Sequence, residues 1–580
     1  MSRREAALSA GAVFVVALVI RAWAATQITF PRPEDVAYYV GVARNLVEGR
    51  GLTTDAIWSF GTPPLSFPRD AFEVWLPLPS ILAAIPMALF GTTFAAAQVS
   101  SILVGSMVCV LAWRLAADVA ASRGMPVGRA RTLAIGTGLT AAAYLPLILA
   151  SVQPDSTMPF AALAIVACLL MTRLSRRLSI EGVREEGIDH FVDRTVRDIE
   201  VRSRLRVALG VVLALAALTR NEAIWLALAF AIVEWSNVRG VYSRLSDRVG
   251  AWGINVIPVA LVAIITFAPW AFRDWLAFGS PFPGQALTNA LSLDGRDIFA
   301  WADPPTLARY LAAGPARLLE LRWIGIVHNL TQVLLLLGIP LSVVGFIGLP
   351  AIWRRRPATS LALAADPLRP LLIFSIITFL VAALVFPVST TWGTFLHASG
   401  AIHVLLVISA LLLLDSVIGW IGTRRGWTNP VAWLGPAFAV AGCLLFSAAI
   451  LPGDGAGARG TADRYAAIGI VFGATRSDTG APDPANVAVD LATEPGPVIS
   501  DFPIWFAEAT RHHTLALPNE GPESILDLAR SFDPPARLLV VDADNSGIWP
   551  AAILSGAPGS ECFVPIELPN LAAYPGALDD

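Results

Sequence analysis

Long runs of apolar residues recur along almost the whole chain, and they limit its possible folds more than any other feature. A helix needs about 20 predominantly apolar residues to cross the hydrocarbon core of a bilayer. Eleven segments approach this requirement, several of them interrupted by polar groups: residues 8–27, 94–117, 132–151, 158–173, 207–219, 223–235, 254–270, 327–352, 371–388, 398–414 and 432–451. The sequence therefore predicts an α-helical polytopic membrane protein with about 11 transmembrane helices.

The composition agrees with this class. Hydrophobic residues make up 55% of the 580 residues and charged residues only 15%, whereas soluble proteins contain about 25% charged residues. The mean hydropathy is +0.64. The net charge of −3 identifies no partner, and the absence of a basic tract argues against nucleic acid. Three of the four cysteines fall in apolar spans, so no disulfide framework outside the membrane is expected.

Arginine residues cluster on one side of the predicted spans, at residues 3–4, 114–131, 173–177, 239–248, 354–356 and 424–425. Loops rich in basic residues face the cytoplasm. Because the first span shows no cleavage site, we expect a cytoplasmic N-terminus and an extracytoplasmic C-terminal segment. The basic residues are all arginine, as is common in GC-rich bacteria. We therefore expect a multi-pass protein of a bacterial plasma membrane.

Two outer loops, residues 28–91 and 273–321, are long for connections between spans, and long ordered loops tend to be functional. In the first loop, segment 74–90 is apolar but interrupted by three prolines, which predicts a re-entrant or interfacial helix. The fourth loop is richer in acidic residues and tryptophan. Both loops are therefore candidates for an active surface outside the membrane.

Residues 33–51, PEDVAYYVGVARNLVEGRG, predict a helix on the membrane surface. Apolar positions recur at helical spacing from Tyr38, while Arg44 takes the other face. Two adjacent carboxylates, Glu34 and Asp35, lie in the first turn. Acidic side chains there are stabilised by the helix dipole. Taken alone, the pair therefore indicates only the start of a helix.

Further ionisable groups fall near the outer ends of the predicted spans, where charges are costly and suggest function. Asp155 follows the third span, Arg220 the fifth, and His397 lies between the ninth and tenth. Glu73 precedes the proline-rich segment, and Arg273 ends the seventh span. Each could instead be a structural partner or an interfacial anchor. Their shared side predicts that they converge on one outer cavity.

The composition changes after residue 452, where the predicted transmembrane domain, 1–452, ends. Residues 453–496 are rich in Gly, Ala, Asp and Pro and predict a linker. Residues 497–580 alternate strand and helix patterns and predict a small extracytoplasmic α/β domain. His512 and His513 could bind a metal, but further ligands at zinc spacing are lacking, which favours ordinary surface residues.

The order of these segments resembles that of the GT-C membrane glycosyltransferases, a group that includes the protein O-mannosyltransferases of family 39 and the aminoarabinose transferase of lipid A. EDVAYYVGVARNLVEGRG resembles the family's first-loop pattern D-E-A-Y-Y-x-x-x-A-R-N-L-x-x-G-x-G from Tyr38 onward. PLPSILAAIPMALFG, LALAALTRNEAIWL and APWAFRDWLAFGSPFP follow in the family's order. The likeness covers most of the chain, and it implies a GT-C-like helical bundle.

The resemblance implies transfer of a sugar, with inversion, from a polyprenyl-phosphate donor to a glycan, lipid or protein acceptor outside the membrane. A lipid phosphate is a good leaving group, so one carboxylate suffices to take the acceptor's proton. Asp35 aligns with the family's catalytic acid. The family's second acid follows the first, whereas here the extra acid, Glu34, precedes Asp35. Both therefore stay candidates for the base, with Asp35 favoured.

The same resemblance suggests roles for the other ionisable residues. Arg220 and Arg273 are candidates for holding the departing phosphate. Glu73 resembles an acid that binds a divalent metal in some members, but no histidine of the fourth loop completes such a site. A divalent metal therefore stays open, and no other cofactor is expected. The remaining candidates for substrate binding are Asp155, His397 and Tyr38.

Two alternatives from other classes stay open. A noncatalytic GT-C-like protein could act as a scaffold in the cell envelope, and an altered acid pair would be its expected sign. A lipid or solute transporter would need broken helices in repeated halves. No internal repeat is visible in the sequence, and the long outer loops suit a catalytic cavity better.

Overall fold

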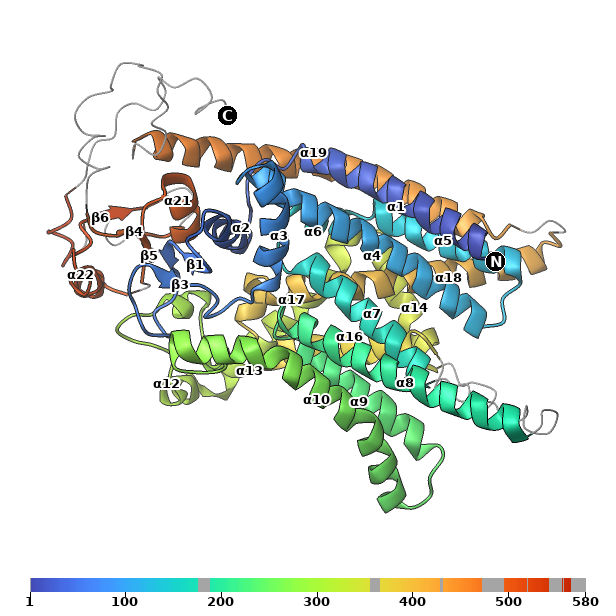
Figure 1. The fold of residues 1–580 in the computed structure, drawn as a ribbon. Helices are drawn as coiled ribbons and strands as arrows, with labels where there is room; N and C mark the ends of the chain where they lie inside the picture. Colours follow the sequence, from blue (N-terminus) through green and yellow to red (C-terminus); the bar gives the residue numbers. More distant parts are fainter. Residues whose placement is uncertain are drawn as a thin grey trace.

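The computed structural model describes residues 2–175, 188–354, 366–427, 431–471, 495–518, 520–541, 555–556 and 558–564. Helices form a long bundle, and small β-sheets lie beyond the end of the bundle that is opposite the N-terminus (Figure 1). The bundle helices are α1 (Arg3–Ala25), α4 (Phe94–Ser122), α5 (Val127–Ala143), α6 (Leu145–Val152), α7 (Thr157–Ser175), α8 (Ile188–Ala217), α9 (Ala223–Arg239), α10 (Leu245–Phe278), α13 (Gly314–His328), α14 (Leu341–Arg354), α16 (Arg369–Leu384), α18 (Gly400–Arg424) and α19 (Leu434–Val471).

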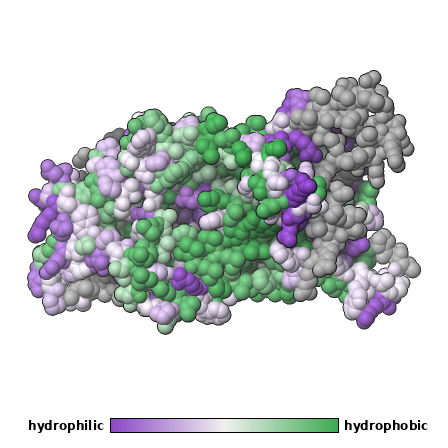
Figure 2. Space-filling view, turned by 90° about the horizontal axis from the view of Figure 1, so that it is seen from below, coloured by the Kyte–Doolittle hydropathy of each residue, from purple (hydrophilic) through white to green (hydrophobic). Residues whose placement is uncertain are grey.

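Among the described residues, seven helices are long and apolar enough to cross a membrane, or eight if the bent pair α5–α6 forms one span. Three shorter apolar helices, Leu78–Phe90, Leu341–Trp353 and Arg369–Leu384, accompany them. An apolar belt crosses the middle of the face in Figure 2, between more hydrophilic parts of the surface. The prediction of a polytopic helical membrane protein is therefore confirmed.

The predicted eighth span, residues 327–352, is wrong as a single helix. Helix α13 continues through a π-helical turn, η3 (Asn329–Leu335), and a 3₁₀ turn, η4 (Leu336–Gly338). Helix α14 then begins anew at Leu341, directly after Pro340. A proline has no N–H to donate and its ring clashes with the preceding turn, so it interrupts a helix. The candidate span is accordingly Gly314–Gly338.

The predicted surface helix is α2 (Glu34–Val47), but it does not lie on a surface. Helix α3 (Leu78–Phe90) packs against it on one side and α21 (Pro503–Thr510) on another. Its buried residues include Arg44, which the sequence placed on an exposed face. The prediction failed because Arg44 finds a buried carboxylate partner, Glu508, in the distant C-terminal segment. A paired charge can be buried at far lower cost than an unpaired one.

Two small sheets lie beside α2. Strands β1 (Thr53–Thr54) and β3 (Arg69–Asp70) pair antiparallel within the first loop. The other sheet is parallel and has the order β2 (Ala56–Ile57), β5 (Thr514–Ala516), β4 (Val498–Ser500), β6 (Leu538–Val540). Helices α21 and α22 (Pro522–Arg530) belong to the same C-terminal segment. Since β2 comes from the first loop, this loop and the C-terminal segment form one sheet.

The predicted linker is partly helical, because α19 extends to Val471. Residues 472–494 lie outside the described part of the chain. The end of α19 packs against α21, and Tyr465 is buried beside Phe30 and Trp505. Tertiary packing contributes more to helix stability than local propensity does. This packing explains why a stretch rich in glycine is helical here.

The fourth loop is shorter than predicted, because α10 extends to Phe278 and α13 begins at Gly314. Short elements fill it: α11 (Ala286–Leu291), η2 (Gly295–Phe299) and α12 (Leu307–Ala312). Two further short helices, η5 (Ser389–Trp392) and α17 (Thr394–Ala398), precede α18. Helix α17 contacts α7 and α16, so it lies against the bundle.

Candidate functional site

A histidine and two aspartates from three separate segments form a continuous chain of contacts. His397 Nε2 lies 2.8 Å from Asp35 Oδ2, and His397 Nδ1 lies 2.8 Å from Asp155 Oδ2. The three residues come from α17, the first turn of α2 and the turn between α6 and α7. We refer to Asp35, His397 and Asp155 as the acid–histidine chain. It unites residues that are 120 and 242 positions apart in the sequence.

Asp155 is fixed by the start of helix α7. Its Oδ1 accepts a hydrogen bond from the backbone N–H of Thr157 at 2.8 Å, and its Oδ2 accepts one from the Thr157 hydroxyl at 2.8 Å. A carboxylate before the first turn satisfies N–H groups that have no partner within the helix. The Asp155 side chain therefore has little freedom, and it holds His397 in one orientation.

The approach to His397 depends on a glycine. Gly393, just before α17, has a φ of 110°, which glycine adopts without the strain of a Cβ atom. A Cβ atom at this position would lie 3.4 Å from His397 Nε2, the atom that contacts Asp35. Glycine therefore suits this position, because it tolerates the positive φ and has no Cβ atom to approach His397.

Charge in the acid–histidine chain is strongly coupled. Burial disfavours a charged imidazole, but the carboxylate of Asp35, together with that of Asp155, raises the pKa of His397 to about 10. Burial alone would raise the pKa of Asp35, but the charges of His397 and Arg220 bring it below the ordinary value. At neutral pH, Asp35 is therefore ionised and His397 carries a proton on each ring nitrogen.

Arg220 lies beside this chain. Its guanidinium donates hydrogen bonds to Glu222 at 2.8 and 3.1 Å, to the Ser156 hydroxyl at 2.8 Å and to the Thr394 carbonyl at 3.1 Å. Ser156 and Thr394 are close in sequence to Asp155 and His397. Arg220 thus ties the same two turns together and brings a positive charge close to Asp35.

The neighbouring acid, Glu34, faces another part of the molecule. Its Oε1 accepts hydrogen bonds from the backbone N–H groups of Ile504 at 3.0 Å and Trp505 at 3.4 Å, at the start of α21. Burial raises the pKa of Glu34 to about 8, and nearby Asp501 and Asp35 add to the rise. Glu34 is therefore mostly protonated near pH 7, unlike Asp35.

Two other predicted residues, Arg273 and Tyr38, make contacts that hold the first loop in place. Arg273 donates to the Ala71 carbonyl at 2.8 Å and to Asp70 at 3.2 Å, and it lies over the Trp270 ring. The Tyr38 hydroxyl accepts the backbone N–H of Phe72 at 2.7 Å. Neither has a described hydrogen bond to the acid–histidine chain. The structure therefore does not bring Arg273 and Tyr38 into the same constellation.

Glu73 is also separate from the acid–histidine chain. It is buried and lies 3.5 Å from Arg69, its ion-pair partner. Within the described part of the chain, no three His, Cys, Asp or Glu side chains are grouped so that they could hold a metal ion. Asp35 and Asp155 share a protonated histidine, and Glu73 is paired with a guanidinium. These donors do not fit a divalent cation.

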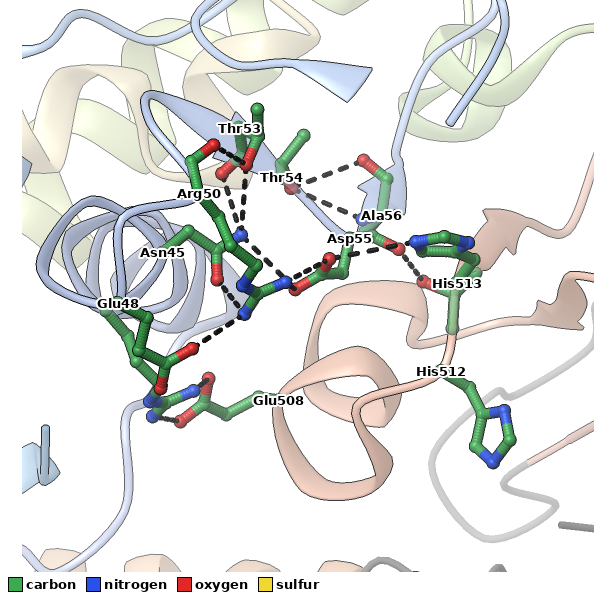
Figure 3. Close-up of polar contacts among 12 residues, drawn as sticks. Asn45, Glu48, Arg50, Thr53, Thr54, Asp55, Ala56, Glu508, His512 and His513 are labelled. Carbon is green, nitrogen blue, oxygen red and sulfur yellow. Dashed lines mark hydrogen bonds and ion pairs between the residues drawn. The ribbon is translucent and has the colours of Figure 1, made fainter. Parts of the chain in front are cut away.

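The C-terminal segment contributes contacts that the sequence did not predict. Figure 3 shows the end of α2 and the following strand facing α21 and the chain around His513. Arg44 donates two hydrogen bonds to Glu508, and Arg50 donates to Asp55 at 2.9 Å. His513 stacks on the Phe67 ring at 4.2 Å, while His512 points away from this network. The two histidines thus do not form a pair.

Some residues around the acid–histidine chain were missed by sequence reasoning. Ser156 and Thr157 directly follow Asp155, and an Asp two residues before a Thr at a helix start is a recognisable capping pattern. That pattern could have predicted the fixed orientation of Asp155. The contact of Arg220 with the Thr394 carbonyl involves a backbone atom, so no side-chain pattern could have identified it.

No protein-family model and no curated protein sequence matches the chain. Among solved structures, it is similar to ArnT from Cupriavidus metallidurans bound to undecaprenyl phosphate, with 14% identity, a TM-score of 0.49, and coverage of 91% of this chain and 89% of that chain. It is also similar to the oligosaccharyltransferase AglB from Archaeoglobus fulgidus, solved with an inhibitory peptide and a dolichol-phosphate, with 12% identity, a TM-score of 0.45, and coverage of 87% of this chain. The chain spans 64% of that archaeal protein. Both TM-scores lie below 0.5.

Proposed function

We propose that this protein is a membrane glycosyltransferase that transfers a sugar, with inversion, from a polyprenyl-phosphate-linked donor to an acceptor outside a bacterial plasma membrane. The observation that carries the proposal is the contact of the Asp35 carboxylate with His397 at 2.8 Å, in a loop whose sequence resembles the GT-C first loop. Asp35 is the base. Its side chain is 16% exposed, so it is held by the protein yet accessible.

The reaction needs one proton acceptor and one site for a departing phosphate. The acceptor's nucleophilic atom forms a bond to the anomeric carbon, on the face opposite the phosphate. The bond between that carbon and the phosphate oxygen breaks, and its electron pair leaves with the lipid phosphate. The proton of the acceptor moves to Asp35 as the new bond forms. No second, protonated carboxylic acid is required, in contrast to glycoside hydrolysis.

His397 and Asp155 orient this base. A protonated histidine between two carboxylates places one oxygen of Asp35 in a fixed position, and Asp155 is itself held by Thr157. Because these charged groups are already in position, the site does not have to rearrange them during the reaction. The pKa values also support Asp35 over Glu34, since a carboxyl that is protonated near pH 7 cannot accept a proton.

Arg220 is our candidate for holding the donor phosphate. Its positive charge lies close to Asp35, and arginine suits phosphate because its planar fork presents several N–H groups. Arg220 forms an ion pair with Glu222, so the two side chains together carry little net charge. A bound phosphate would therefore share the Arg220 guanidinium with the Glu222 carboxylate. Arg273 is not assigned this role, because its hydrogen bonds to Ala71 and Asp70 hold the first loop.

The experiment that tests the function is a mass-spectrometric survey of lipids in a deletion strain that carries wild-type protein, Asp35→Asn or Asp303→Asn. Asp303 is a matched control, because its side chain is 75% exposed. We expect polyprenyl-phosphate sugars to accumulate in the deletion strain and with Asp35→Asn, whose turnover should fall about 10²-fold or more. They should not accumulate with Asp303→Asn.

Two outcomes would contradict the proposal. If the deletion strain accumulates no lipid-linked sugar, the protein does not consume such a donor. If Asp35→Asn restores the lipid profile as well as the wild-type protein does, Asp35 is not the base. Equal amounts of both variants in the membrane fraction are needed for the comparison.

A further inference from the structure

Two adjacent acids of α2 hold this helix from two directions. Consecutive side chains on an α-helix project about 100° apart. Asp35 accordingly contacts His397 of the membrane bundle, whereas Glu34 contacts α21 of the C-terminal segment. The two carboxyl groups therefore contact different parts of the molecule.

Glu34 supplies the cap that α21 lacks in its own sequence. The residue before α21, Phe502, makes no side-chain capping bond. Backbone N–H groups in the first turn of a helix have no partner within the helix. Glu34 Oε1 accepts two of them, from Ile504 and Trp505. A residue of the first loop thus completes a helix that lies 470 positions further along the chain.

Further contacts run along the same interface. Trp505 Nε1 donates to the Pro31 carbonyl at 2.9 Å, just before α2. Arg44 pairs with Glu508, with side chains that are 4% and 11% exposed. In Figure 3, Glu508 projects from α21 toward α2. Strand β2 of the first loop also pairs with β5 of the C-terminal segment. The C-terminal segment is therefore fastened to both ends of α2.

The first turn of α2 is thus held on one side by α21 and on the other by His397. We propose that Glu34 is a positioning residue: by capping α21 it docks the C-terminal segment on α2 and so keeps Asp35 against His397. This inference rests on the proposed function, in which Asp35 is the base. It gives α21 a positioning role through its contact with Glu34, although α21 contributes no residue to the acid–histidine chain.

Glutamine and alanine at position 34 distinguish this role from catalysis. The amide oxygen of glutamine can still accept the two N–H bonds but cannot take a proton. We expect Glu34→Gln to lower kcat by less than about threefold, since the cap is retained. Glu34→Ala should lower kcat about tenfold or more, because small misplacements of a catalytic group are costly. The KM for the polyprenyl-phosphate sugar should change little in both variants, since Arg220 is untouched.

Hydrogen–deuterium exchange of the full-length protein supplies a readout that does not depend on activity. In Glu34→Ala, amides of residues 503–510 and of the first turn of α2 should exchange faster than in the wild type. Glu34→Gln should resemble the wild type in both peptides. Glu523→Ala is the matched control, because Glu523 is an exposed glutamate of the first turn of α22. It should change neither exchange nor turnover.

Each contrary result has a distinct meaning. If Glu34→Gln is as inactive as Asp35→Asn, Glu34 takes part in proton transfer and the positioning role is wrong. If Glu34→Ala keeps wild-type turnover or leaves the exchange of both peptides unchanged, Glu34 does not hold Asp35 in place. If the wild-type protein itself transfers no sugar, the proposed function fails, while the exchange experiment still decides whether Glu34 docks α21 and steadies α2.

Discussion

His397 is the residue on which the charge of the site depends. Both of its ring nitrogens contact carboxylates, at 2.8 Å each. A neutral imidazole carries only one N–H, so it could donate to only one of them. The protonated form satisfies both aspartates at once. The two carboxylates and the histidine proton therefore stabilise one another, and the site should lose order when this proton is lost.

This coupling predicts a pH dependence of stability. The pKa of His397 rises from its ordinary 6.5 to about 10 in the folded protein. A histidine whose pKa is raised on folding stabilises the folded state when it is protonated. This contribution is complete below pH 6.5 and decreases as the pH rises toward about 10. We therefore expect the Tm of the wild-type protein to fall between these pH values. His397→Gln should reduce that fall, as measured by thermal unfolding in detergent.

A matched histidine variant controls this measurement. His512→Gln changes a histidine that lies outside the acid–histidine chain, so the slope of Tm against pH should stay that of the wild type. An unchanged slope in His397→Gln would mean that other groups cause the pH dependence. A second readout is the acid limb of kcat/KM, which should move to higher pH in His397→Gln, because Asp35 loses the charge that lowers its pKa.

Helix α2 shows how an element of the first loop becomes part of the interior. Its apolar and aromatic positions pack against the first loop and α21, in a cluster that includes Tyr38, Tyr39 and Ile504. A second face packs against α3 and the start of α4. Periodicity correctly predicted a helix with an apolar face. It could not predict that the polar face would also be covered, because Glu508 lies far away in the sequence.

The first loop is also fastened at the end of α10, and this gives a prediction for Arg273. Arg273 donates to the carbonyl of Ala71 and to Asp70, close to strand β3. We expect Arg273→Ala to release residues 52–72, with amide exchange about tenfold faster, because hydrogen bonds to charged groups are the stronger ones. The KM for the lipid-linked donor should stay near the wild-type value.

Arg317→Ala serves as the control for this variant, because Arg317 is exposed and pairs with Glu320 within α13. It should leave exchange of residues 52–72 unchanged. An increased donor KM in Arg273→Ala, without faster exchange of the first loop, would return Arg273 to the role of a phosphate ligand. The two measurements together therefore separate fastening of the loop from binding of the donor.

For the whole molecule, the side of the membrane that holds the site can be tested without a new cysteine. Cys562 is exposed, whereas Cys109, Cys168 and Cys443 are buried. Its neighbour Phe563 packs against the core around β2 and β5, so Cys562 lies at the sheet end. If this end is extracytoplasmic, a membrane-impermeant maleimide should label Cys562 in intact cells. Cys562→Ser is the control and should abolish labelling.

If Cys562 is labelled only in permeabilised cells, the predicted topology is wrong and the sheet end faces the cytoplasm. The arginine clusters would then face the outside, against the usual distribution of basic residues. Ser246→Cys in the Cys562→Ser background provides the complementary test, because Ser246 is exposed and lies on the predicted cytoplasmic side. It should react only after permeabilisation.

Sequence alone determined that the chain is a helical membrane protein, because hydrophobicity over about 20 residues is a local property. It also identified Asp155, Arg220 and His397 as candidate site residues, because ionisable residues near the ends of predicted spans can be recognised in the sequence. It placed Arg273 and Tyr38 with them, but their hydrogen bonds belong to the first loop.

Only the tertiary structure decided which acid of the pair at positions 34 and 35 faces the histidine. Both stand in the same turn, so local sequence treats them almost alike. Their environments differ because side chains one residue apart point about 100° apart and meet partners from distant segments, Glu34 at α21 and Asp35 at His397. Which partner each side chain contacts is therefore decided only when those segments have packed around it.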